Sequence, residues 1–265
     1  ASRFKGENGE VDVYVPYGIP VQANALELEQ TLSLHAGAFL LSEEEGLLKE
    51  SHRRMSKIKS KEITLFKESS LWLDALQLST PPGTYGLSVE FETETGAGEG
   101  FHRIDLEVPA FSDNQLQLSD LMLAYVVEEA GGVEEAPPGS LLRDGLLIKP
   151  APWGVFSKDQ PMYLYFEMYN LKKNAENRSS YAVESALVEY RGEKGLGKLL
   201  KRAFRGRAKE GVSVRFNNTG EHTDEGQYLI LEAQEQPVGT YVLAMRVTDL
   251  VSKKTVEIKR LVLLE

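Results

Sequence analysis

A short segment occurs twice in this chain and limits the folds that the chain can adopt. Residues 237–241 (PVGTY) open an alternating apolar stretch, and residues 81–85 (PPGTY) open another one. In β-sandwich domains, a turn followed by such a tyrosine marks the corner where the chain crosses from one sheet to the other, and the tyrosine hydroxyl bonds back to upstream backbone. We therefore predict structural corners at Tyr85 and Tyr241.

The residue two positions after each corner tyrosine is a leucine, Leu87 or Leu243. An antibody domain has a disulfide-forming cysteine at this place. The chain has no cysteine, so we expect an apolar contact in place of the bridge. Because the corner occurs twice in 265 residues, we predict two tandem domains, 1–112 and 113–265, by the usual size of domains.

The remaining strand signals have the alternation and the turns that are typical of sandwiches. Residues 10–16 alternate and stop at a proline, residues 101–108 return after a glycine-rich loop, and residues 121–127 open the second domain. A last hairpin is expected to pair residues 241–247 with 256–264. The predicted fold class is all-β, with two tandem immunoglobulin-like or fibronectin-III-like β-sandwich domains.

One segment has helical periodicity instead, and it forms a basic insert at 192–211 in the second domain. Its apolar residues recur at the spacing of one helical face, namely Leu196, Leu199, Leu200, Ala203 and Phe204. Its basic residues are Lys194, Lys198, Lys201, Arg202, Arg205, Arg207 and Lys209. We predict a short amphipathic helix. Its apolar stripe covers an end or an open edge of the sandwich, and its charges are either a solvated face or a contact surface.

The net charge of the chain limits the kinds of partner that the basic insert could bind. The net charge is −10, which disfavours nucleic acid as a partner because a duplex needs a basic footprint. A local basic surface on an acidic protein could meet anionic lipid head groups, an acidic protein partner or a neighbouring copy. The chain begins with Ala1 and not with Met, so we expect it to be a processed or excised piece of a longer protein.

No residue pattern points to catalysis or to a cofactor. His35, His52, His102 and His222 lack metal-ligand spacing, and no nucleophile-elbow pattern occurs. We therefore expect no catalytic, cofactor-binding or metal-binding residues, and no enzyme. Aromatic residues leave one alternative open: Tyr163, Tyr165 and Tyr169, with Trp72 or Trp153 added, could form a platform for sugar, although tyrosine is common in strands anyway.

Several motifs together resemble the C-terminal β-rich region of bacterial GWxTD-domain proteins. They are residues 11–16 (VDVYVP), 118–121 (LSDL), 161–171 (PMYLYFEMYNL), 212–214 (VSV), 239–241 (GTY) and 247–249 (VTD). The motif that names the family is absent. The resemblance covers most of the chain, and it implies a location in the bacterial periplasm or at the cell surface, with no established reaction.

These observations lead to one expected function and an alternative. We expect a non-catalytic structural or adaptor subunit of a bacterial envelope assembly, which binds a protein partner, such as a membrane-associated complex, through its sheet edges and the basic insert. The alternative is a carbohydrate-binding β-sandwich module. An accessory domain of a hydrolase ranks third.

Overall fold

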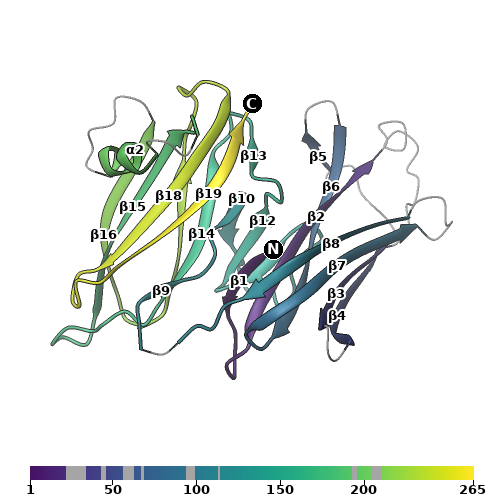
Figure 1. The fold of residues 1–265 in the computed structure, drawn as a ribbon, viewed down its shortest axis with the longest axis horizontal. Coiled ribbons are helices and arrows are strands. Elements are labelled where there is room, and N and C mark those ends of the chain that lie inside the picture. Colours follow the sequence, from purple (N-terminus) through teal and green to yellow (C-terminus); the bar gives the residue numbers. More distant parts are fainter. Residues whose placement is uncertain are drawn as a thin grey trace. The chain divides into compact units, whose positions relative to one another are not determined.

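The computed structural model describes residues 1–21, 34–42, 46–55, 63–66, 69–93, 99–112, 114–192, 196–204 and 211–265. Regular structure in these ranges consists of β-strands and of one short helix, α2 (Leu196–Ala203). The chain is all-β with several sheets (Figure 1). It divides into two compact units: unit 1 holds Ala1–Phe111 and Ala130–Pro152, and unit 2 holds Ser112–Glu129 and Trp153–Glu265. Segment 130–152, which we assigned to the second domain from the sequence, thus groups with unit 1.

Unit 1 contains two four-stranded antiparallel sheets, with the strand orders β1-β2-β6-β5 and β4-β3-β7-β8. The strands of the first sheet are β1 (Ser2–Lys5), β2 (Val11–Val21), β5 (Ile63–Phe66) and β6 (Ser69–Thr80). The strands of the second sheet are β3 (Leu34–Ser42), β4 (Gly46–Met55), β7 (Gly83–Thr93) and β8 (Glu99–Val108). The chain therefore passes from the first sheet to the second between β6 and β7, where the corner at Tyr85 was predicted.

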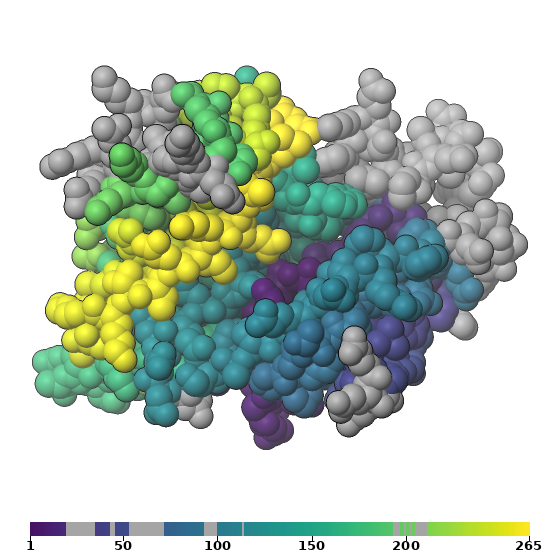
Figure 2. Space-filling view, in the orientation of Figure 1, coloured from purple at the N-terminus to yellow at the C-terminus, as the bar shows by residue number. Residues whose placement is uncertain are grey.

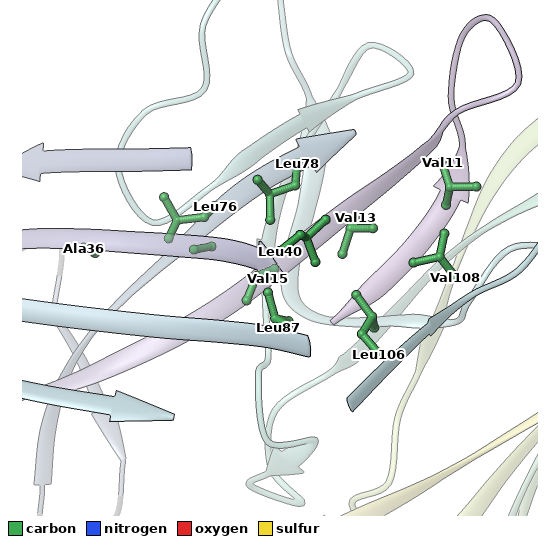
Figure 3. Close-up of a cluster of buried hydrophobic side chains, with 11 residues drawn as sticks. Val11, Val13, Val15, Ala36, Leu40, Leu76, Leu78, Leu87, Leu106 and Val108 are labelled. Carbon is green, nitrogen blue, oxygen red and sulfur yellow. The ribbon is translucent and has the colours of Figure 1, made fainter. Parts of the chain in front are cut away.

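The core of unit 1 lies between these two sheets, and alternation along each strand supplies it. Figure 3 shows side chains of the first sheet, among them Val13 and Leu78, beside those of the second sheet, among them Leu40 and Leu87. All four side chains are buried. Full burial of a valine or leucine side chain contributes about 1.5–3 kcal/mol, so this cluster is a main source of the unit's stability.

A hairpin late in the chain, β11 (Leu141–Arg143) with β12 (Leu146–Pro150), completes unit 1. The guanidinium of Arg143 donates to the Asp12 carboxylate at 2.7 Å and to the Lys5 carbonyl at 2.9 Å. The amide of Gly139 donates to the buried carboxylate of Asp74 at 3.1 Å. Two carboxylates on β2 and β6 therefore hold segment 130–152 to this unit.

Unit 2 has one sheet with the order β13-β19-β18-β15-β16. In a second set of strands, β14 pairs with β10 on one side and with β17 on the other, and β9 also pairs with β14. The bounds of the first sheet are β13 (Val155–Phe156), β15 (Ser179–Glu189), β16 (Val212–Gly220), β18 (Gly239–Asp249) and β19 (Thr255–Leu264). The bounds of the others are β9 (Gln117–Leu118), β10 (Met122–Glu129), β14 (Met162–Tyr169) and β17 (Glu225–Leu231).

The last hairpin has the predicted pairing, since Tyr241 lies opposite Val262 and Val247 lies opposite Val256. The passage from β17 to β18 changes sheets, as the passage from β6 to β7 does in unit 1. Figure 2 shows β19, in yellow, at the surface of unit 2, and its Leu261 is 59% exposed.

Candidate functional site

Both predicted corner tyrosines make the bond that a tyrosine corner requires. The hydroxyl of Tyr85 donates to the carbonyl of Pro81 at 2.8 Å, and the hydroxyl of Tyr241 donates to the carbonyl of Pro237 at 2.8 Å. Leu87 and Leu243 are buried, as expected for residues that replace a disulfide with an apolar contact. These four residues therefore have structural roles, two in each unit.

The basic insert is represented by helix α2 and by Phe204, which follows it. Its Leu200, Ala203 and Phe204 are buried in a cluster with Ala186 and Val188 of β15 and with Val242 and Ala244 of β18. Along β18, the residues that alternate with Val242 and Ala244 are buried as well, so the strand is covered on both faces. The helix thus covers the outer face of the sheet, and not an end or an open edge of the sandwich as we had expected.

The charged side of this insert is described at two residues. Lys198 and Lys201 are exposed on α2, and Arg202 lies in the helix. The other basic residues proposed for partner binding, Lys194, Arg205, Arg207 and Lys209, lie outside the described residues. The described part of the helix therefore has one buried apolar side and two exposed ammonium groups.

An arginine of the sheet connects α2 to a small charged network. The guanidinium carbon of Arg246 lies 4.1 Å from the centre of the Phe204 ring, which is the geometry of a cation–π contact. The same guanidinium pairs with Glu257 at 2.6 Å and with Glu184 at 3.6 Å. The position of Phe204 is therefore fixed by packing and by charge together.

Unit 1 has a pocket on the outer face of the sheet β4-β3-β7-β8, which we call the sheet-face pocket. Its volume is about 820 Å³, within the range of known ligand sites. Four adjacent strands supply its lining, which includes His35, Phe39, His52, Glu90, Glu92, Phe101 and Arg103. Sequence reasoning gave no role to these residues, because they come from strands up to 68 positions apart (35 to 103) and share no motif.

The two histidines of the sheet-face pocket form a hydrogen-bonded chain across three strands. His35 Nε2 lies 3.2 Å from His52 Nδ1, and His35 Nδ1 lies 3.4 Å from a carboxylate oxygen of Glu92. His52 Nε2 lies 3.4 Å from a carboxylate oxygen of Glu50. The rings are stacked with centroids 5.2 Å apart. Each imidazole is therefore held in place by partners on both of its nitrogens.

Unit 2 contains a buried carboxylate between two tyrosines on strand β14. Glu167 accepts hydrogen bonds from the hydroxyls of Tyr165 and Tyr169, at 2.6 and 2.7 Å. Its backbone also exchanges hydrogen bonds with Ser119, which lies just after β9. The spacing i, i+2, i+4 places all three side chains on one side of a strand. The cluster could therefore have been predicted from the sequence. The arrangement satisfies polar groups and is structural.

The aromatic platform considered for sugar is not assembled from the residues that we named. Trp72, Tyr165 and Tyr169 are buried, and Tyr163 is half-buried. Trp153, at 48%, is substantially exposed.

Among the described residues, no group of three or more His, Cys, Asp or Glu could hold a metal ion. No helix of the described residues is long and apolar enough to cross a membrane.

The fold therefore defines an all-β protein of two compact units, each with a tyrosine corner. No protein-family model matches the chain, and no curated protein matches it. Among solved structures, the chain is similar to Escherichia coli alpha-2-macroglobulin activated by porcine elastase, with a TM-score of 0.29 and 10% sequence identity. The match covers 97% of this chain and 22% of that one, so the chain spans about a fifth of its length.

Proposed function

We propose that this chain is a non-catalytic structural or adaptor subunit of a bacterial envelope assembly, built from two tandem immunoglobulin-like or fibronectin-III-like sandwiches. The observation that carries the proposal is the arrangement of α2. The helix buries its apolar side on β15 and β18 and exposes Lys198 and Lys201 on a chain of net charge −10. A local reversal of charge on a rigid support is suited to an acidic protein partner, because complementary potentials steer association.

Two further features support the proposal. Strand β8 forms one end of its sheet and β16 forms one end of another, and an end strand can be extended by a strand of another chain. The location in the periplasm or at the cell surface rests on the resemblance to the β-rich region of GWxTD-domain proteins. An anionic membrane surface is the second kind of partner that the basic insert suits.

A pull-down from membranes of the native host tests the adaptor role. In the test variant, Lys198, Lys201, Arg202 and Arg205 are all replaced by Gln. We expect this variant to fold normally and to lose its co-purifying protein at a lower salt concentration than the wild type, because the contact is electrostatic. A matched variant carries the same number of changes elsewhere in unit 2, at Lys158, Lys172, Lys254 and Lys259.

The matched variant is expected to behave as the wild type does. The proposal fails if the test variant retains its partner at the wild-type salt concentration, or if both variants lose the partner equally. The partner of the insert is a protein and not a membrane if the test variant releases the protein partner but still binds vesicles of anionic lipid as the wild type does.

The alternative, a carbohydrate-binding module that uses the predicted tyrosine and tryptophan platform, has less support. Such a platform needs several exposed aromatic faces, whereas three of its five candidate residues are buried. The adaptor role is therefore the function that the described geometry supports best.

A further inference from the structure

The sheet-face pocket of unit 1 combines features that no part of the adaptor role uses. The pairing of the strands places His52, Gly37, Glu90 and Phe101 in one row across β4, β3, β7 and β8. The next row holds Phe39, Ser88 and Arg103. Because side chains alternate along a strand, both rows point to the same face of the sheet.

A glycine in the middle of the first row leaves room for the rings. A Cβ atom at Gly37 would lie 2.8 Å from two carbon atoms of the Phe39 ring and 3.3 Å from His52 Nδ1. Any larger residue at this position would displace these rings. The absence of a side chain at Gly37 thus keeps the two rings in the positions that line the pocket.

An aromatic side chain at the rim is presented to solvent without cover. Phe101 is 77% exposed, although leaving a phenylalanine side chain in water is unfavourable compared with burying it. Phe39, in the neighbouring row, is half-buried. Flat apolar faces beside polar groups are suited to ligands that have apolar and hydroxyl-bearing sides, and sugar rings have both.

The charges of the lining select against strongly charged ligands. The lining includes two carboxylates, Glu90 and Glu92, and one guanidinium, Arg103, so a polyanion would meet the carboxylates and a polycation would meet the arginine. Glu92 also lies against His35, and Glu90 accepts a hydrogen bond from Ser88 at 2.9 Å. The lining therefore offers two positioned acceptors and one charged donor, with little net charge.

We propose that the sheet-face pocket binds a neutral saccharide chain, with Phe101 stacking on a sugar ring and with Glu90 and Arg103 bonding to its hydroxyls. The His35–His52 pair contributes fixed ring surfaces, because its nitrogens are already engaged by each other and by glutamates. This site lies in unit 1, whereas α2 lies in unit 2, so the proposal stands or falls separately from the adaptor role.

Isothermal titration of the full chain tests this proposal, with cellohexaose, mannohexaose, xylohexaose and chitohexaose as probes. We expect saturable binding of at least one of them. Phe101→Ala should weaken that binding about tenfold, since an aromatic contact contributes up to about 1.5 kcal/mol. Arg103→Gln should weaken it about three- to tenfold through the loss of a charged donor. Both side chains are exposed, so both variants should fold as the wild type does.

Leu261→Ala provides the matched control, because this side chain is a large exposed apolar group in unit 2. It should bind the saccharide with the wild-type affinity. The proposal is overturned if none of the four hexasaccharides binds, or if Phe101→Ala binds as tightly as the wild type. Tighter binding of hexalysine or hexaglutamate than of any saccharide would also overturn it, and would indicate a peptide site instead.

Discussion

Tyr241 and Tyr85 make the same bond to the backbone, but they differ in their access to water. Tyr241 is buried and Tyr85 is half-buried. The hydrogen bond of Tyr241 is half-buried, whereas that of Tyr85 is exposed, so water replaces a lost donor less readily at Tyr241. We therefore expect Tyr241→Phe to lower the free energy of unfolding by about 1–2 kcal/mol, and Tyr85→Phe to lower it by less than about 1 kcal/mol.

Urea unfolding measures both changes, with the fluorescence of Trp72 reporting on unit 1 and that of Trp153 reporting on unit 2. Tyr228→Phe is the control, because its ring is exposed on β17 and the substitution should change little. Equal losses at the two corners would contradict the role that we assign to burial.

Glu167 gives a second prediction at the scale of single residues. A carboxylate has two acceptor oxygens for the hydroxyls of Tyr165 and Tyr169, whereas a glutamine amide has one acceptor and an NH2 group that only donates. We expect Glu167→Gln to cost about 2 kcal/mol, because one buried hydroxyl loses its acceptor.

The measurement is again urea unfolding of unit 2. Glu232→Gln makes the same chemical change at an exposed position after β17, and it should cost almost nothing. A Glu167→Gln variant as stable as Glu232→Gln would show that the two tyrosines bond elsewhere.

At the scale of elements, the turn between β18 and β19 depends on one buried carboxylate. Burial by itself opposes ionisation of Asp249, but hydrogen bonds outweigh it and lower the pKa of this carboxyl. They come from the Ser252 hydroxyl at 2.5 Å and from the amides of Lys172, Val251 and Ser252. The ionised form is therefore stabilised in the folded state.

A lowered pKa fixes the sign of the pH dependence. The contribution of Asp249 is fully present above pH 3.8, the usual value for an aspartate, and it is lost as the pH falls through the lower pKa of the folded state. We expect Asp249→Asn to be less stable than the wild type at neutral pH by about 1–2 kcal/mol, and the gap to narrow in acid. Thermal unfolding across this pH range measures the gap, and a constant gap would contradict the prediction.

Helix α2 gives the second prediction at this scale. Phe204 is buried against β15 and β18 and lies under the guanidinium of Arg246. Phe204→Ala should cost about 3 kcal/mol through the lost packing and the cavity that remains. Lys201→Ala changes an exposed residue of the same helix and should leave stability nearly unchanged. Hydrogen exchange at α2 would show whether the helix detaches in Phe204→Ala while the sheet beneath it remains intact.

The positions of the strands could be predicted from the sequence, but the place where the helix packs could not. Alternation located the strands on both sides of each corner, because side-chain direction along a strand repeats every two residues. The prediction that α2 covers an end or an open edge of the sandwich was wrong, although β18 contained the signal for a covered face: Val242 and Ala244 alternate with Leu243 and Met245. A strand that is apolar on both sides must be covered on both sides.

At the scale of the whole molecule, the division into units depends on contacts that no local pattern contains. The bond between Arg143 and Asp12 joins residues 131 positions apart, and that between Gly139 and Asp74 joins residues 65 positions apart. The sequence therefore predicted a break near residue 112 but not the return of segment 130–152 to unit 1. The sheet-face pocket escaped prediction for the same reason, because pairing of four strands creates it.

At this scale, unit 2 should lose stability at alkaline pH, because it contains two tyrosines with a raised pKa. Burial raises the pKa of Tyr125 to about 12, and the charge of Glu265 adds to this. Burial also raises the pKa of Tyr181 to about 12; the charge of Glu225 adds to this, and a hydrogen bond with Asn218 opposes it. An unfolded tyrosine ionises near pH 10, so the unfolded state loses its proton first.

The stability contributed by these neutral tyrosines is thus complete below pH 10 and is lost as the pH rises to about 12. The loss should be on the order of 1 kcal/mol for each tyrosine once solvent screening is allowed for. Phenolate absorbance at 295 nm should show a late step near pH 12, which shrinks in Tyr125→Phe and again in the double variant with Tyr181→Phe. If the late step keeps its full amplitude in the double variant, the stabilised neutral tyrosines are not those of unit 2, and the alkaline sensitivity must come from another part of the molecule.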